Sequence, residues 1–105
     1  MKMSFIVIAV VALSLGACAK KAVTRVTLEV PDTFSGHVHL LPCSPDAKEP
    51  TVLNDMNEGP TSACPPGDVE IEVHKGTKTF VIPPEKVNVR RLANGQPNAI
   101  TAEIP

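Results

Sequence analysis

Apolar and polar residues alternate one by one in several short segments of this chain. Residues 23–30 (VTRVTLEV) and 68–74 (DVEIEVH) show the clearest alternation. Successive side chains of a β-strand point to opposite faces, so this period of two indicates strands with one buried and one solvated face. Eleven prolines in 105 residues also oppose helices, because proline lacks the backbone N–H that a helix interior needs. The pattern favours an all-β domain.

Four more strands and a short edge piece fit the same description. They lie at residues 36–41, 51–53 (the edge piece), 77–82, 86–92 and 98–104. Asn94-Gly95 gives the strongest hairpin signal between them, because both residues tolerate a positive φ. Short strands with regular turns predict a six- to seven-stranded antiparallel β-sandwich in a single domain, residues 23–105. Its opening strands and strand spacing resemble small prealbumin-like or carboxypeptidase-regulatory-like envelope domains, which implies an Ig-like or prealbumin-like sandwich and transfers no functional residue.

The start of the chain predicts export from a bacterial cytoplasm. Lys2 supplies a positive charge, and residues 3–15 form an apolar run of 13 residues. Such a run suits a signal peptide and is shorter than the roughly 17–25 residues of a membrane-spanning helix. We therefore expect residues 1–17 to be a signal helix that is removed.

The apolar run ends in the sequence L-G-A-C at residues 15–18. This sequence resembles the lipobox of bacterial lipoproteins, in which an aliphatic residue and two small residues precede a cysteine. The resemblance implies that Cys18 is acylated and begins the mature protein, with residues 18–22 as a tether to a membrane. Gly16 stands where Ala or Ser is more usual. Two alternatives stay open: cleavage after Ala19, giving a soluble periplasmic or secreted protein, and an uncut anchor.

The residue after the cysteine bears on the choice of membrane. In lipoproteins of the enterobacterial type, an Asp at this position retains the protein in the inner membrane. Residue 19 is Ala, so the resemblance implies the outer membrane, with the domain facing the periplasm. The chain from Cys18 to Val23 spans on the order of 15 Å when extended, which keeps the domain close to the bilayer. Another envelope protein could be its partner there.

Three cysteines are an odd number for an exported protein. If Cys18 carries lipid or leaves with the leader, Cys43 and Cys64 remain to form a disulfide in an oxidising compartment. Closing a loop of about 22 residues should stabilise the fold by about 3 kcal/mol in the chain-entropy model. The alternative is a metal site that uses both thiolates, but the pair lacks the C-x-x-C spacing of such sites.

Residues 42–66 interrupt the alternation and hold six of the eleven prolines. Long loops in small domains are usually functional, disordered or covalently fastened, and the cysteine pair predicts the last of these. Asp55, Asn57 and Glu58 make one stretch of this loop rich in oxygen. The stretch lacks the full spacing of a calcium loop, so we expect a solvated loop there.

Two histidines on one predicted strand form the most suggestive candidate site. His37 and His39 are two residues apart and point to the same face, so both imidazoles could approach one metal ion. His74 lies on the outer face of another predicted strand, and would complete a three-histidine site if the two strands were neighbours. Envelope Cu(II) or Zn(II) would suit these ligands. The alternative is three solvated surface histidines.

Other classes of function have less support. Once Lys2 is set aside, nine Lys and Arg stand against eleven Asp and Glu, so no basic stripe marks a nucleic-acid partner. Trp and Tyr are absent, which removes the usual platforms for carbohydrates. No common catalytic motif is present. We therefore expect a lipid-anchored binding or structural module of the cell envelope without catalysis or cofactor, with periplasm-facing copper or zinc binding as the alternative.

Overall fold

The computed structural model of the chain describes residues 22–105. The predicted signal helix of residues 1–17, the lipidation site at Cys18 and all of the tether before Ala22 lie outside the described residues. In the part that is described, no helix has the length and hydropathy needed to cross a bilayer.

Eight β-strands and one short 3₁₀ helix make up the described residues. The strands are β1 (Val23–Val30), β2 (Gly36–Leu41), β3 (Thr51–Val52), β4 (Glu58–Pro60), β5 (Asp68–Lys75), β6 (Lys78–Ile82), β7 (Asn88–Arg91) and β8 (Pro97–Ile104). The 3₁₀ helix η1 (Pro84–Lys86) lies between β6 and β7, so β7 is shorter than the predicted strand at residues 86–92. The predicted all-β class is confirmed.

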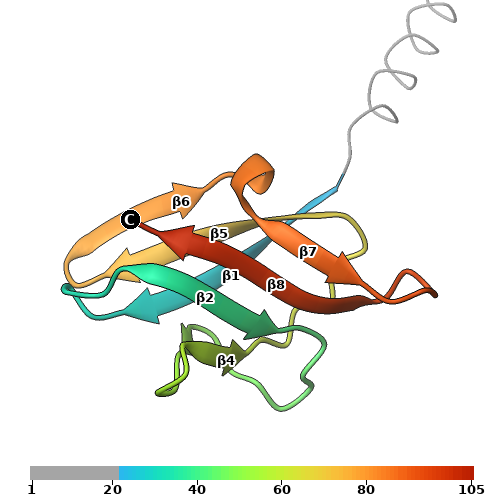
Figure 1. Cartoon of the computed structure of the whole chain (residues 1–105), viewed down its shortest axis with the longest axis horizontal. Coiled ribbons are helices and arrows are strands. Elements are labelled where there is room, and N and C mark those ends of the chain that lie inside the picture. Colours follow the sequence, from blue (N-terminus) through green and yellow to red (C-terminus); the bar gives the residue numbers. More distant parts are fainter. Residues whose placement is uncertain (1–21) are drawn as a thin grey trace, which may run out of the picture.

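The strands form two four-stranded sheets, one in front of the other (Figure 1). The first sheet has the order β3-β1-β5-β6, and the second has the order β4-β2-β8-β7. The inward side chains of both sheets share one buried core, as the alternation predicts for two apolar faces. Its buried members are Val26, Leu28, Val30, Val38, Leu40, Val69, Ile71, Val73, Ile82, Ile100, Ala102 and Ile104.

Both sheets are mixed, so the prediction of purely antiparallel pairing is wrong. β1 pairs in parallel with β3 and with β5, and β2 pairs in parallel with β4. The other three pairs, β2–β8, β5–β6 and β7–β8, are antiparallel. The consecutive strands β1 and β2 belong to different sheets, so each takes its partners from farther along the chain. Alternation identifies the buried face of a strand and leaves its partner undetermined.

The count of eight strands also exceeds the predicted six or seven, because β4 has no strand pattern in the sequence. Glycine and proline, which occupy positions 59 and 60, are both uncommon in strands. The segment is a strand through its pairing alone, with Leu40 opposite Gly59 and Leu41 opposite Pro60. Tertiary context therefore overrides local preference at this edge.

The hairpin between β7 and β8 forms where Asn94-Gly95 predicts it. Gly95 has a φ of +86°, and its N–H donates to the carbonyl of Leu92 at 2.9 Å. The side-chain oxygen of Asn94 accepts a hydrogen bond from the N–H of Gln96 at 2.9 Å. These bonds close the turn, and the predicted hairpin is confirmed.

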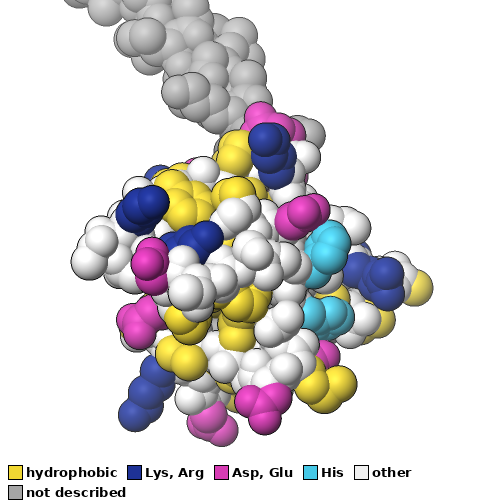
Figure 2. Space-filling model, turned by 60° about the vertical axis from the view of Figure 1, so that its left-hand side comes forward, with side chains coloured by type: hydrophobic (Ala, Val, Ile, Leu, Met, Phe, Trp, Pro, Cys, Tyr) yellow, Lys and Arg dark blue, Asp and Glu magenta, His cyan; other side chains and the backbone are white. Residues whose placement is uncertain are grey.

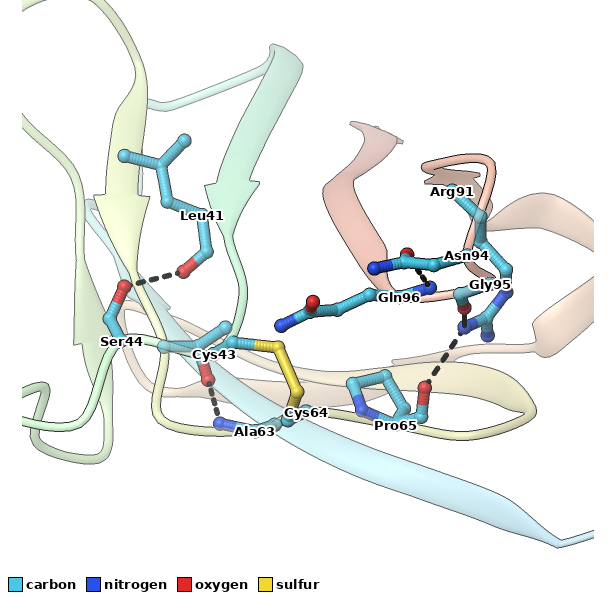
Figure 3. The surroundings of a disulfide bond; sticks show 11 residues. Leu41, Cys43, Ser44, Ala63, Cys64, Pro65, Arg91, Asn94, Gly95 and Gln96 are labelled. Atoms are coloured by element: carbon cyan, nitrogen blue, oxygen red, sulfur yellow. Dashed lines mark hydrogen bonds between the residues drawn. A yellow bond between two sulfur atoms is a disulfide. The ribbon is translucent and has the colours of Figure 1, made fainter.

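A disulfide fastens the proline-rich loop to the end of β2 (Figure 3). Cys43 and Cys64 are joined, with their Cα atoms 4.5 Å apart. The N–H of Cys43 donates to the carbonyl of Ala63 at 2.8 Å, and the N–H of Ser44 donates to the carbonyl of Thr61 at 3.0 Å. The residues before Cys64 thus run beside the residues after β2, continuing the contact that β4 makes with it.

Within residues 22–105, the two sheets share one buried core and the chain is fastened by one disulfide.

Candidate functional site

An open groove of about 420 Å³ runs along the solvent side of β2. We call it the histidine groove; its lining includes His37, His39, Met56, Asn57, Glu58 and Thr101. The two histidines point the same way because they are two positions apart on one strand. Two histidine side chains lie next to one another on the face shown in Figure 2, with carboxylates around them.

The strands on either side of β2 supply the polar neighbours of these histidines. Glu58 on β4 lies opposite His39 on one side, and Thr101 on β8 lies opposite it on the other. Glu103 lies opposite His37, and its Oε2 is 3.9 Å from Nε2 of that imidazole. The side chain of His37 is 84% exposed, and a contact between such exposed groups is worth little. The imidazole of His37 therefore remains available to a ligand.

A closed turn holds Met56 at the edge of the groove. Oδ1 of Asn54 accepts hydrogen bonds from the N–H of Met56 at 2.9 Å and from the N–H of Glu58 at 3.0 Å. Asn57 has a φ of 60°, a left-handed conformation that asparagine tolerates better than most residues. The N–H of His39 donates to the carbonyl of Asn57 at 2.9 Å, which fastens the turn to β2. Met56 is 76% exposed although its backbone is held.

The structure does not bring His74 together with His37 and His39. His74 is on β5 in the first sheet, whereas the other two histidines are on β2 in the second sheet. The outer faces of two stacked sheets point away from each other, so the neighbouring-strand condition for a three-histidine site is not met. Within residues 22–105, no group of three or more His, Cys, Asp or Glu side chains is placed to hold a metal ion.

His74 belongs instead to a charge network on the outer face of the first sheet. Its Nε2 lies 2.8 Å from Oε2 of Glu72, and Arg25 on β1 donates to Oε1 of Glu72 and to Oε1 of Glu70, each at 3.1 Å. The hydrogen bond and charge of His74, with smaller contributions from Arg25, lower the pKa of Glu72 against the opposing effect of burial. The hydrogen bond and charge of Glu70, with a smaller contribution from Glu72, raise the pKa of Arg25. The arrangement is that of an ion-pair network between neighbouring strands.

A second hollow, of about 520 Å³, lies beside the edge strand β6 and the C-terminal end of β8. Its lining includes Phe80, Ile82, Pro83, Lys86, Glu103 and Pro105. Its surface is mostly apolar, and it contains neither a histidine nor a cysteine among these residues. The joined Cys43 and Cys64 lie elsewhere, and as a disulfide their sulfur atoms are not thiolate ligands.

No pattern in the sequence indicated that Met56 and Glu58 would belong to the histidine groove. The sequence predicts a solvated loop for this stretch because strand and calcium-loop patterns are both incomplete. One signal was present: Met56 is the single methionine after the leader, and it lies within a polar stretch. An isolated thioether among Asn, Asp and Glu has no core to join, which is a reason to ask what it contacts.

Comparison with known proteins gives little for this chain. No protein-family model matches it, and no curated protein matches it. A solved structure from Bacillus anthracis, described as a “Putative Lipoprotein”, matches with a TM-score of 0.44 and 13% sequence identity, over 79% of this chain and 71% of that chain. No role of any residue is taken from that protein.

Proposed function

We propose that this chain is a lipid-anchored module of the bacterial cell envelope that binds a partner or supports a structure there and performs no catalysis. The observation that carries the proposal is the L-G-A-C sequence at the end of the apolar leader, so close to the domain. Four residues separate Cys18 from Val23, where β1 begins. A tether of this length spans on the order of 15 Å, so an acylated Cys18 would hold the domain at the membrane surface.

The place where the chain enters the domain supports this arrangement. Val23 is paired with Asp68 at the start of both strands, so the first residue of β1 is already part of the first sheet. A side chain at Gly67 would have its Cβ only 2.8 Å from the carbonyl oxygen of Ala22, so the two backbones are in close contact. The tether would therefore leave from a fixed point, and the end of the domain that holds this point would face the bilayer.

The histidine groove is away from that end. β2 begins at the far side of the domain from the start of β1, as Figure 1 shows, and His37 and His39 are its second and fourth residues. In an anchored protein the groove would be open to the periplasm.

Mass spectrometry of the protein isolated from bacterial envelopes tests the anchor. We expect an N-terminal peptide that begins with acylated Cys18, and we expect the protein in the membrane fraction. In a C18S variant the acyl groups should be lost, because serine offers no thiol. An N-terminus at Lys20 would show release after Ala19, and an intact leader would show an uncut anchor; either result would refute the lipid anchor.

We infer delivery to the outer membrane from the Ala at residue 19. In an enterobacterial host, an A19D variant should move from the outer-membrane fraction to the inner-membrane fraction on density-gradient separation. An A19S variant serves as the matched control and should stay in the outer membrane. If the unmodified protein is already in the inner membrane, the outer-membrane inference is wrong.

A further inference from the structure

The histidine groove contains two kinds of metal ligand on a prepared scaffold. His37 and His39 offer imidazole nitrogens from one face of β2. His74 has a short hydrogen bond with Glu72 at 2.8 Å, whereas Oε2 of Glu103 is 3.9 Å from Nε2 of His37. The imidazoles of the groove are thus less committed to protein partners than that of His74.

Met56 adds a thioether to the same groove. Leaving a large apolar side chain 76% exposed forgoes the free energy that its burial would release. The turn that presents it is closed by hydrogen bonds that the N–H groups of Met56 and Glu58 donate to Oδ1 of Asn54, and it is fastened to the backbone of His39. A side chain on such a held backbone loses less conformational freedom when it binds than one on a loose loop.

We propose that the histidine groove binds a single copper ion through the imidazoles of His37 and His39 and the thioether of Met56. Thioether sulfur is a soft ligand that selects Cu(I), and imidazole binds copper in both oxidation states. Zinc prefers nitrogen, thiolate and carboxylate ligands, and calcium and magnesium take oxygen. Of these metals, copper is therefore the one that the thioether of Met56 would bind.

Glu58 contributes charge to this site. It lies opposite His39 in the register of β2 and β4, and it lines the same groove. Its carboxylate would partly offset the charge of the ion. The site does not depend on the lipid anchor, because every residue in it belongs to the two sheets and their loops.

Each proposed metal ligand can be observed separately, because methionine and histidine are rare in the domain. Residues 19–105 contain one methionine, Met56, and three histidines. This part of the chain can be produced by secretion into an oxidising compartment, because it holds the core that both sheets share and both paired cysteines. With ¹³C-methyl methionine and ¹⁵N histidine labels, nuclear magnetic resonance reports on Met56 and on each imidazole separately.

Silver(I), a redox-inert substitute for Cu(I), is the first probe, followed by Cu(I) without oxygen. We expect the methyl signal of Met56 and the ring signals of His37 and His39 to shift together, reaching completion at one ion per chain. The ring signals of His74 should not move, which makes that residue an internal control. Shifts of the histidines without Met56, or equal shifts of all three histidines, would refute the proposed site.

Variants separate the thioether from the imidazoles. M56L keeps the size of the side chain and removes the sulfur; we expect it to weaken Cu(I) binding at least about tenfold, since loss of outer-shell partners alone costs about that much. Zn(II) affinity should change less than twofold in the same variant. An H37A/H39A double variant should lose Cu(I) binding, and H74A should retain it. Equal losses of Cu(I) and Zn(II) affinity in M56L would overturn the assignment to copper. Full-length protein in detergent should give the same Cu(I) affinity.

Discussion

At the scale of single residues, Arg91 shows how one side chain can connect distant segments. Its guanidinium donates to the carbonyl oxygens of Pro65 at 3.1 Å, Gly67 at 2.6 Å and Gly95 at 3.1 Å, and part of this set is visible in Figure 3. The register of β7 against β8 shifts between Arg90 and Arg91, which redirects the side chain. Alternation alone would place Arg91 on the buried face. With the bulge, its guanidinium joins the segment after Cys64 to the hairpin between β7 and β8.

Removing this link should destabilise the domain. R91A leaves three carbonyls without their charged donor, and we expect a loss of about 2 kcal/mol in the free energy of unfolding, measured by urea denaturation. R91K should recover little, because an ammonium cannot reproduce the planar fork. R90A is the matched control, since Arg90 is exposed, and should change stability by less than about 0.5 kcal/mol. Equal effects of R91A and R90A would contradict this role.

The lowered pKa of Glu72 predicts that the stability of the fold decreases at low pH. Its pKa in the folded protein is lowered from the ordinary value of 4.5, chiefly by the hydrogen bond with His74. The carboxylate therefore stabilises the fold fully above pH 4.5, and this contribution disappears as the pH falls through the lower folded pKa. E72Q should flatten the fall of the urea midpoint below pH 4.5, whereas E85Q, at an exposed position, should not. Parallel curves for the unmodified protein and E72Q would exclude this linkage.

At the scale of elements, β3 and β4 are held by a close approach of backbones. A Cβ at Gly59 would lie 2.7 Å from Cγ2 of Thr51 and 2.8 Å from the carbonyl oxygen of Val52. Glycine is therefore required at position 59 because a side chain would not fit there. Its backbone conformation is not the reason, since its φ is not positive. The turn with Met56 immediately precedes β4, so the geometry of the histidine groove depends on this contact.

A methyl group at Gly59 should therefore be costly. We expect G59A to destabilise the domain by about 1–3 kcal/mol, in the range for overpacked positions. T51S removes Cγ2 and keeps the hydroxyl that donates to the carbonyl of Pro60 at 3.1 Å. In a double-mutant cycle T51S should restore part of the loss, but not all, because the contact with Val52 remains. Strict additivity of the two variants would show that Thr51 is not the obstacle.

At the scale of the whole molecule, the two sheets and the disulfide form one unit. The link between Cys43 and Cys64 closes a loop that contains β3 and β4, one from each sheet. These short edge strands have few ladder hydrogen bonds of their own. The covalent link therefore restricts the unfolded chain in the region where the strand pattern is weakest.

Removing the disulfide should lower stability by about 3 kcal/mol, as expected for a loop of this size. A C43A/C64A double variant measured by urea denaturation tests this value, and a C18S variant of the same chain is the control. In denatured, unreduced protein from envelopes, thiol-specific labels should not modify Cys43 or Cys64. Labelling of both cysteines would disprove the disulfide in the cell.

Local alternation is sufficient to assign the buried and solvated faces of the strands. Alternation places Val26, Leu28 and Ile71 in the core and turns His37 and His39 to the outer face, where His37 is exposed and His39 half-buried, because the side-chain period of a strand is a local property. The Asn94-Gly95 turn is equally predictable because a turn depends on adjacent residues, although only Gly95 of the two adopts a positive φ.

Which strands meet depends on the three-dimensional arrangement of the whole domain. This arrangement placed His74 on the opposite sheet from His37 and His39, set Met56 beside them, and turned Gly59 and Pro60 into a strand. Each of these outcomes depends on pairing between segments that are far apart in the chain. The alternation in a sequence shows which face of a strand is buried, but it does not show which strand pairs with it. The members of the histidine groove could therefore be found only in part before the fold was known.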